Sequence, residues 1–243
     1  MNILRNRFNN GWAAPSHVCV FLMLAVSVVG GCETVGQKAP PYPESTTARM
    51  HYELGNKFLN TGDYVQAADQ FRQSIKIEDG AFLPYARLAT AYYGQQKYLD
   101  AATAFSRATE VSGGPRNAGP FPILQALSLM RGGQVQEAEA LLKRWSGPDV
   151  VVDATGSYYA GAGTLPGIWK TAARYVLGEV SEADYLAEAP QDDLSFPYLI
   201  IGIRDVIDEK GPKARESLSK VVSVAPGGTW RVALARAELS LFS

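Results

Sequence analysis

The amino-acid sequence predicts an all-α protein, a helical-repeat solenoid of about five helix pairs with a C-terminal capping helix. A shift of 34 residues superimposes apolar positions on one another: Leu54 on Leu88, Tyr64 on Tyr98, Ala67 on Ala101 and Phe71 on Phe105. Within each copy, apolar residues recur at the spacing of an α-helix. The chain contains no sustained run of alternating apolar and polar residues, so a β or α/β fold is disfavoured.

The two clearest copies each contain two amphipathic helices joined by a short turn. The expected helices are Ala48–Asn60 and Tyr64–Ile77 in the first copy, and Leu83–Gly94 and Tyr98–Val111 in the second. Thr61-Gly62-Asp63 separates the first two helices, and Gly113-Gly114-Pro115 stops the fourth. Glycine and proline at these points are typical helix terminators.

Later copies match the pattern more loosely. The expected segments are a third copy over Phe121–Trp145, a shortened helix pair over Trp169–Leu177 and Glu182–Ala189, a late copy over Tyr198–Pro226, and a terminal capping helix over Trp230–Leu241. Residues 149–167 are rich in glycine and fit no repeat, so their role is left open.

The layout of small and large residues resembles the tetratricopeptide repeat. The residues that carry this resemblance are Leu54-Gly55, Phe58, Gly62, Tyr64, Ala67 and Phe71, and then Leu88-Ala89, Tyr92, Tyr98, Ala101, Phe105 and Ala108. The resemblance implies stacked antiparallel helix pairs. It also implies a concave face, lined by the first helix of each pair, that captures extended peptides or partner helices.

The N-terminus has the layout of an export signal. Arg5 and Arg7 precede an apolar run from Val18 to Val29. A helix of that length would reach roughly 18 Å, which is short of the roughly 30 Å hydrocarbon core of a membrane. Such a run is typical of a signal peptide rather than of a membrane span.

Val29-Gly30-Gly31-Cys32 resembles the lipobox of bacterial lipoproteins. The resemblance implies cleavage before Cys32 and attachment of lipid to its sulfur, which divides the chain into a signal peptide (1–31), a lipidated cysteine with a Pro-rich tether (32–47) and a repeat domain (48–243). Glu33, rather than aspartate, follows the cysteine. By family analogy this favours the periplasmic face of the outer membrane.

The C-terminal half carries a narrower resemblance. The residues involved are Trp169, the segment 175–181, the late copy, Ala233 and the segment 237–242. Their order resembles outer-membrane lipoproteins with tetratricopeptide repeats that serve as adaptors between peptidoglycan hydrolases and a periplasmic protease. The resemblance extends in layout over about residues 28–242. It implies a homodimer, protein clients and no catalysis, while a pilotin-like assembly factor for a secretin or pilus is the alternative.

Residues suited to chemistry are few. His51 is the one histidine left after cleavage, and we interpret it as structural rather than catalytic. Asp192-Asp193 could serve a glycan-acting enzyme, but charge at a helix start explains the pair as well. Gly161–Gly167 lacks the Gly-Lys-Ser/Thr ending of a phosphate loop. We therefore expect no enzyme, no cofactor and no metal site, and a net charge of −1 supplies no basic field for nucleic acid.

The concave face is the better candidate for function. The residues predicted to line it are Arg49, Tyr52, Asn56 and Asn60 on the first helix and Thr90 and Tyr93 on the third. Their spacing of three and four places each set on one helix face. Tyrosine and arginine are favoured anchors in interfaces, and asparagine can pair with a peptide backbone. A solvated helix face is the alternative interpretation.

Overall fold

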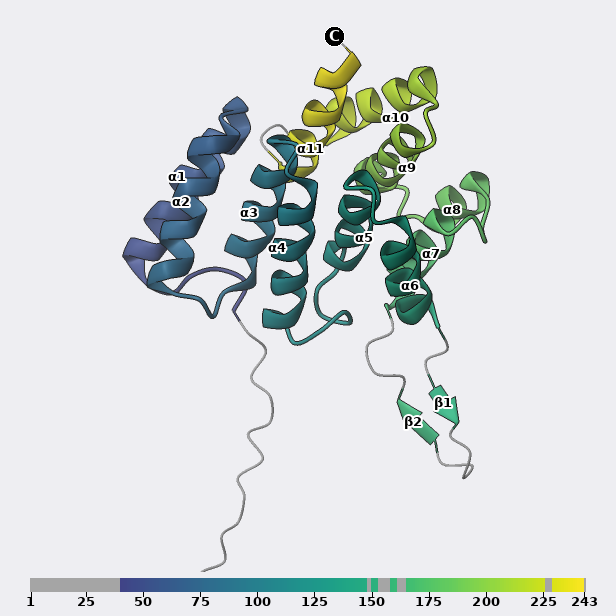
Figure 1. Ribbon diagram of the computed structural model, residues 1–243, viewed down its shortest axis with the longest axis horizontal. Helices are drawn as coiled ribbons and strands as arrows, with labels where there is room; N and C mark the ends of the chain where they lie inside the picture. Colours follow the sequence, from purple (N-terminus) through teal and green to yellow (C-terminus); the bar gives the residue numbers. More distant parts are fainter. Residues whose placement is uncertain (1–39, 148–149, 153–157, 161–164, 226–228, 243) are drawn as a thin grey trace, which may run out of the picture. The chain divides into compact units, whose positions relative to one another are not determined.

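The structure, a computed structural model, describes residues 40–147, 150–152, 158–160, 165–225 and 229–242 (Figure 1). These residues contain five consecutive helix pairs, one further α-helix, a short β-hairpin and a 3₁₀ helix. These residues all lie within one compact unit, Lys38–Ser243. The pairs are α1 (Thr46–Thr61) with α2 (Tyr64–Ile77), α3 (Phe82–Gly94) with α4 (Tyr98–Val111), α5 (Phe121–Arg131) with α6 (Val135–Ser146), α7 (Gly167–Val176) with α8 (Glu182–Glu188), and α9 (Ser195–Ile207) with α10 (Gly211–Val224).

The helix ends follow local sequence signals. The Ser45 hydroxyl accepts a hydrogen bond from the Ala48 amide at the start of α1, and the Asp63 carboxylate accepts one from the Gln66 amide at the start of α2. Gly62 ends α1 in the left-handed region, at φ 82°. Side-chain caps and a left-handed glycine satisfy backbone groups that a helix leaves unpaired. The first helix therefore begins at Thr46, two residues before the boundary that the sequence predicts.

Small residues allow the two helices of a pair to approach closely. A Cβ atom added to Gly55 of α1 would lie 2.6 Å from Cε1 of Phe71 on α2. In the last pair, a Cβ atom added to Gly202 of α9 would lie 2.6 Å from Cγ of Leu218 on α10. In both the first and the last pair, a glycine on the first helix therefore packs against a large apolar side chain of the second helix.

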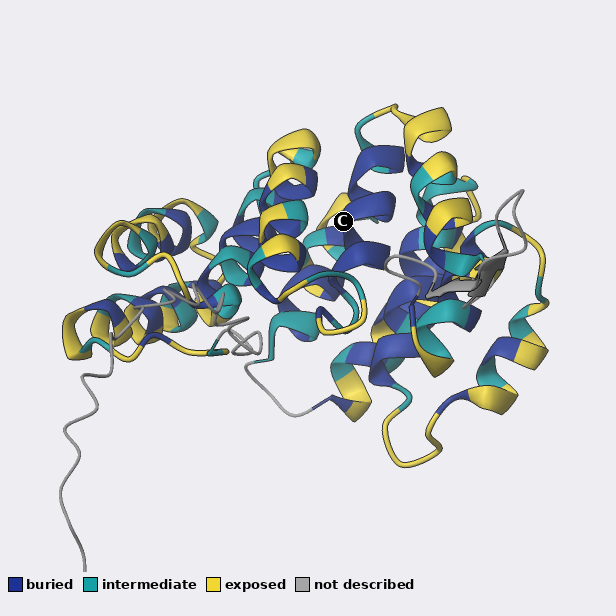
Figure 2. Ribbon diagram, turned by 90° about the horizontal axis from the view of Figure 1, so that it is seen from below, coloured by how far each residue is buried: buried dark blue, intermediate teal, exposed yellow. Residues whose placement is uncertain are grey.

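Each pair also packs against the next pair, through α2 with α3, α4 with α5, α6 with α7, and α8 with α9. The α5 helix lies in the middle of this stack and contacts α4, α6, α7 and α9. Its residues from Phe121 to Met130 are all buried. Figure 2 shows the buried residues running along the sides of the helices that face one another. The all-helical prediction and the consecutive packing of helix pairs are therefore confirmed.

A C-terminal helix, α11 (Trp230–Leu239), is present where the sequence predicts the capping helix, but its contacts reach beyond the last pair. It contacts α10, its neighbour in sequence, but also α9, α3 and α1 (Figure 1). Four consecutive residues, from Val232 to Ala235, are buried, which requires neighbours on every side of the helix. A short 3₁₀ helix, Ser240–Phe242, follows it.

A small β-hairpin is a second departure from the expected fold. Strand β1 (Val150–Val152) pairs in antiparallel fashion with β2 (Tyr158–Ala160), and Val151 lies opposite Tyr159. The hairpin falls within the glycine-rich segment that fits no repeat. Each strand has three residues, too few for an alternating pattern to stand out in the sequence.

Candidate functional site

The six residues predicted to line a concave face do not share one environment. Tyr52, Thr90 and Tyr93 are buried, with exposed fractions of 1%, 1% and 2%. Asn56 is half-buried, while Arg49 and Asn60 are exposed. The side chains of the three buried residues are occupied by contacts within the chain, so they do not offer an open surface to a partner in this conformation.

The segment preceding α1 covers the first part of the predicted face. The ring of Tyr42 meets that of Tyr52 edge to face, with 5.7 Å between centroids. The guanidinium of Arg49 donates two hydrogen bonds to the carbonyl oxygen of Pro43, at 3.1 and 2.9 Å. Glu78 accepts hydrogen bonds from the backbone amides of Glu44 and Ser45, at 2.9 and 2.7 Å. The segment just before α1 is therefore docked against α1 and the residue that follows α2.

The C-terminal helix occupies the second part of that face. The Tyr93 hydroxyl donates a hydrogen bond to Oε1 of Glu238, whose side chain is fully buried. The guanidinium of Arg131 donates to both carboxylate oxygens, at 3.0 Å from Nε and 3.2 Å from Nη2, and also to the Tyr98 hydroxyl at 2.8 Å. We call Tyr93, Tyr98, Arg131 and Glu238 the α11 clamp, because they fasten that helix to α3, α4 and α5.

Burial dominates the electrostatics of the clamp. It raises the pKa of Glu238 above the ordinary value of 4.5, while Arg131 and the Tyr93 hydroxyl act in the opposite direction. Burial, followed by the nearby Glu238 charge, raises the pKa of Tyr93 well above 10.0. A buried carboxylate is tolerated when a cation and a hydrogen-bond donor surround it, as Arg131 and the Tyr93 hydroxyl do here.

Further contacts along α11 extend this attachment. The Tyr64 hydroxyl donates to the carbonyl oxygen of Ala233 at 3.2 Å, and Arg236 donates to the carbonyl oxygen of Asn60 at 3.4 Å. Asn60 is predicted to contact a partner protein. In the structure its backbone carbonyl accepts a hydrogen bond from the C-terminal helix.

The residues weighed for chemistry have structural partners. His51 Nδ1 lies 2.8 Å from Oε1 of Gln70. The Asp193 carboxylate accepts hydrogen bonds from the Ser195 amide and hydroxyl at the start of α9, and pairs with Arg231 at 2.8 Å. These contacts lower the pKa of Asp193, with the Ser195 hydroxyl as the largest cause. Asp193 therefore stabilises a helix start and joins it to α11.

Other predicted residues lie outside the described part of the chain. These are Cys32, the apolar run before it and most of the glycine-rich loop 161–167. Among the described residues, no group of three or more histidine, cysteine, aspartate or glutamate side chains is placed to hold a metal ion.

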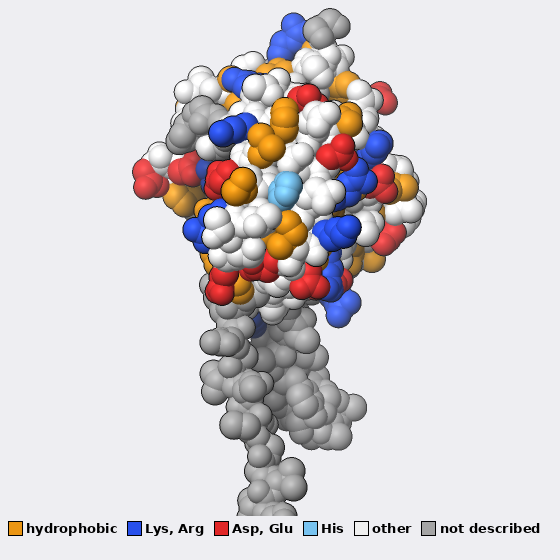
Figure 3. Space-filling model, turned by 90° about the vertical axis from the view of Figure 1, so that its left-hand side faces the viewer, with side chains coloured by type: hydrophobic (Ala, Val, Ile, Leu, Met, Phe, Trp, Pro, Cys, Tyr) orange, Lys and Arg blue, Asp and Glu red, His pale blue; other side chains and the backbone are white. Residues whose placement is uncertain are grey.

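The α1–α2 end of the stack exposes apolar side chains, which Figure 3 shows around the pale-blue histidine. The most exposed are Met50 and Leu54 on α1 and Val65 and Ile77 on α2, with Met50 67% exposed. The terminal repeats of a solenoid usually have a polar outer face. The exposed face of α1 and α2 is therefore less polar than the outer face of a typical terminal repeat.

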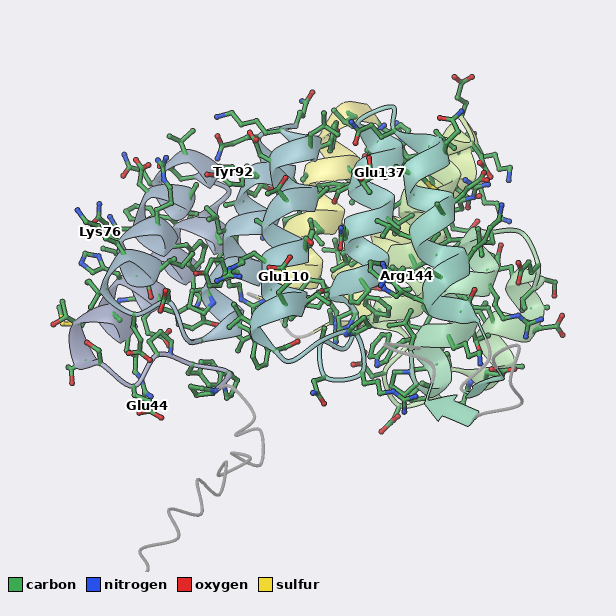
Figure 4. The ribbon with its side chains drawn as sticks, turned by 60° about the horizontal axis from the view of Figure 1, so that its bottom comes forward. Glu44, Lys76, Tyr92, Glu110, Glu137 and Arg144 are labelled. Atoms are coloured by element: carbon green, nitrogen blue, oxygen red, sulfur yellow. The ribbon has the colours of Figure 1, made fainter. Side chains whose placement is uncertain are left out.

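An open groove lies between α4, α5 and α6. Its volume is about 340 Å³, and its lining residues are Leu99, Ala102, Thr103, Ser106, Gln125, Leu129, Gln134 and Glu137. Figure 4 shows Glu110 on α4 and Glu137 on α6, the two helices that border it. A larger concavity of about 420 Å³ is lined by Gly211, Pro212, Arg215 and Phe242. Arg215 there already donates a hydrogen bond to the carbonyl oxygen of Phe242, at 2.8 Å.

Comparison with models of known families, with curated proteins and with solved structures found no match for the chain. None of the helices in the described residues is both long enough and apolar enough to cross a membrane.

Sequence reasoning missed the role of Glu238 in fastening α11. Glu238 follows Leu234 by four residues, which places a carboxylate on the apolar side of α11. That spacing is a detectable signal of a buried charge.

Proposed function

We propose that this chain is a lipid-anchored, non-enzymatic scaffold of the tetratricopeptide-repeat type, which binds other proteins of the bacterial cell envelope. The observation that carries the proposal is the stack of five consecutive helix pairs. Solenoids of this kind present long surfaces built from neighbouring repeats, and such surfaces serve in contact rather than in turnover.

Close packing within the pairs supports the repeat type. The contact of Gly55 with Phe71 and the contact of Gly202 with Leu218 occupy corresponding places in the first and last pairs. A Cβ atom added to Gly94 would lie 2.4 Å from Cδ1 of Tyr64, so a third glycine allows close packing between pairs. Gly55, Tyr64 and Phe71 are also among the residues that carry the sequence resemblance to the tetratricopeptide repeat.

The anchor is proposed to be Cys32. The basic residues, the apolar run and the two glycines precede it in the order that lipoprotein processing requires. Two or three acyl chains hold a protein on a membrane more durably than one. We propose the periplasmic face of the outer membrane as the location.

The proposed partners are envelope proteins such as peptidoglycan hydrolases or a periplasmic protease, together with a second copy of this chain. The resemblance of the C-terminal half to hydrolase adaptors supports this class of partner. A pilotin-like role in secretin or pilus assembly would use the same scaffold with a different client.

The test is crosslinking mass spectrometry on intact cells that carry the wild-type chain or a Cys32→Ala variant. We expect the wild type to remain in the membrane fraction and to crosslink reproducibly to a small set of envelope proteins. The Cys32→Ala variant should leave that fraction and lose most of those crosslinks. Crosslinks to a secretin would favour the pilotin role, and a wild-type chain without reproducible partners would contradict the scaffold proposal.

A further inference from the structure

Two arginine side chains lie against the ring of Trp230, the first residue of α11. The guanidinium carbon of Arg87, on α3, lies 5.9 Å from the ring centroid, and that of Arg231, on α11, lies 5.6 Å from it. Arginines in such positions are attracted by the ring. Two positive charges are therefore held together where α11 packs against α3 (Figure 1).

Each of the two guanidinium groups has a buried N–H donor without an acceptor. These donor atoms are Nη1 of Arg87 and Nε of Arg231. No other side-chain nitrogen in the described part of the chain is both buried and unpaired. Buried polar groups are hydrogen-bonded in the large majority of cases. Two unpaired donors beside the same ring therefore indicate an acceptor that binds between them.

The charges of the two arginines are compensated unequally. Nη1 of Arg231 donates to Oδ2 of Asp193 at 2.8 Å and to the Ser195 hydroxyl at 2.9 Å. None of the described carboxylates lies within ion-pair distance of Arg87. The two arginines thus carry one positive charge more than the neighbouring carboxylate neutralises.

The surroundings make this surplus charge unfavourable. Burial lowers the pKa of Arg87 and the charge of Arg231 acts in the same direction, whereas Tyr52 and Tyr42 oppose them. The side chain of Arg231 is nevertheless 25% exposed, and Tyr42 is 48% exposed. A small anion that approaches from this open side would pair with the unused donors and reduce the repulsion between the arginines.

A carboxylate matches the arginine pair better than a phosphate does. Its two coplanar oxygens fit the parallel N–H groups of a guanidinium. Its single negative charge equals the surplus charge of the pair, whereas a phosphate group carries between one and two negative charges at neutral pH. The adjacent N-terminus of α11 adds a partial positive charge that favours an anion.

We propose that Arg87 and Arg231 form a binding site for a carboxylate group at the start of α11. The carboxylate accepts hydrogen bonds from Nη1 of Arg87 and from Nε of Arg231. Asp193 holds Arg231 from the start of α9 and leaves its Nε free for the ligand. The proposal does not depend on the scaffold function, since it requires an anion and no protein client.

The test measures thermal unfolding of the full-length protein, purified in detergent, with sodium acetate as the probe. Acetate replaces chloride at constant ionic strength, so that general screening of charges stays the same. Arg87→Met removes the charge and keeps a long unbranched side chain. Arg107→Met is the matched control, because Arg107 is exposed and lies 5.9 Å from the ring centroid of Tyr85.

We expect about 100 mM acetate to raise the Tm of the wild type and of Arg107→Met by about 2–4 °C. Arg87→Met should show no such rise. Without acetate it should unfold at a higher temperature than the wild type, because it no longer buries an uncompensated charge. A wild type that does not respond to acetate, or an Arg87→Met variant that responds equally, would overturn the proposal.

Asp193→Asn provides a second test that does not remove either arginine. Asparagine can still accept hydrogen bonds from Ser195, so the start of α9 is retained. Without the competing negative charge, Arg231 should bind acetate about threefold more tightly. Unchanged or weaker acetate binding in a folded Asp193→Asn variant would contradict the site. A wild type that responds to phosphate but not to acetate would contradict the assignment to a carboxylate.

Crosslinking in cells distinguishes the source of the carboxylate. Loss of crosslinks in Arg87→Met, but not in Arg107→Met, would assign the carboxylate to a partner protein. Crosslinks that are the same in both variants would assign it to a small organic acid. A wild type without partners would refute the scaffold function, while the acetate response would still decide whether the site exists.

Discussion

Glu238 and Arg131 form an ion pair that joins the C-terminal helix to the end of α5, across 107 positions of sequence. The Glu238 side chain is fully buried and that of Arg131 is 18% exposed. Removing one member of a buried pair leaves the other charge uncompensated, whereas removing both is often tolerated. The effect of a substitution in this pair on stability should therefore depend on which charge it leaves buried.

Arg131→Gln should destabilise the protein by about 3 kcal/mol or more, because the carboxylate of Glu238 would remain buried without a cation. Glu238→Gln should cost about 1 kcal/mol, because a carboxamide can still accept hydrogen bonds and Arg131 can reach water. Urea unfolding of both variants measures the difference. Equal losses in the two variants would contradict the arrangement, and the double variant should recover part of the Arg131→Gln loss.

The clamp also predicts a pH dependence. Because burial raises the pKa of Glu238 above 4.5, the folded chain holds this proton more tightly than the unfolded chain does. The stability that protonation contributes is complete below pH 4.5 and is lost as the pH rises through the folded-state pKa. The wild type should therefore lose stability relative to Glu238→Gln over that rise. A difference that grows in the opposite direction would show that Arg131 outweighs burial.

Close packing within the pairs makes Gly55 and Gly202 sensitive to a single methyl group. Alanine normally stabilises a helix interior by about 1 kcal/mol relative to glycine. At Gly55 the added atom would instead meet the fully buried ring of Phe71 at 2.6 Å. We expect Gly55→Ala and Gly202→Ala each to cost about 1–2 kcal/mol net, as overpacked cores do. Gly80→Ala, with no atom within 4 Å of the added Cβ, is the control and should change stability little.

The docking of the segment before α1 depends on Glu78. Glu78→Ala removes the acceptor for two backbone amides, so Glu44 and Ser45 should exchange their amide protons about tenfold faster, the equivalent of roughly 1.4 kcal/mol. Hydrogen exchange followed by mass spectrometry or NMR measures this change. Glu53→Ala, at an exposed position on α1, should leave both rates as they are. Unchanged exchange in Glu78→Ala would mean that other contacts hold the segment.

Local signals were enough to predict the helices. Gly62, Asp63 and the apolar spacing around Ala67 and Phe71 predict the first pair to within about two residues at each end, because caps and periodicity act over a few positions. Even the irregular pair α7 and α8 follows from such signals. The hairpin within the glycine-rich segment was not predicted, since its strands are too short to show a pattern.

The site was harder to predict, because it depends on contacts between residues far apart in sequence. Helical spacing correctly groups Tyr52 with Arg49 on α1, yet it contains no information on what covers them. The covering residues are Tyr42 and Pro43 on one side and, near Tyr93, Glu238 at 145 positions along the chain. Repeat patterns describe neighbouring pairs, and a helix that packs across several pairs falls outside them.

If Cys32 carries the proposed lipid anchor, the docked segment before α1 would also limit how far the folded part of the chain can travel from the membrane. With residues from Pro41 onward held by Leu83, Arg49 and Glu78, eight peptide units separate Cys32 from Pro40. A fully extended chain of that length spans at most roughly 29 Å. Envelope proteins on the same membrane would then encounter the chain at a high effective concentration, so that even weak contacts with it would be occupied much of the time.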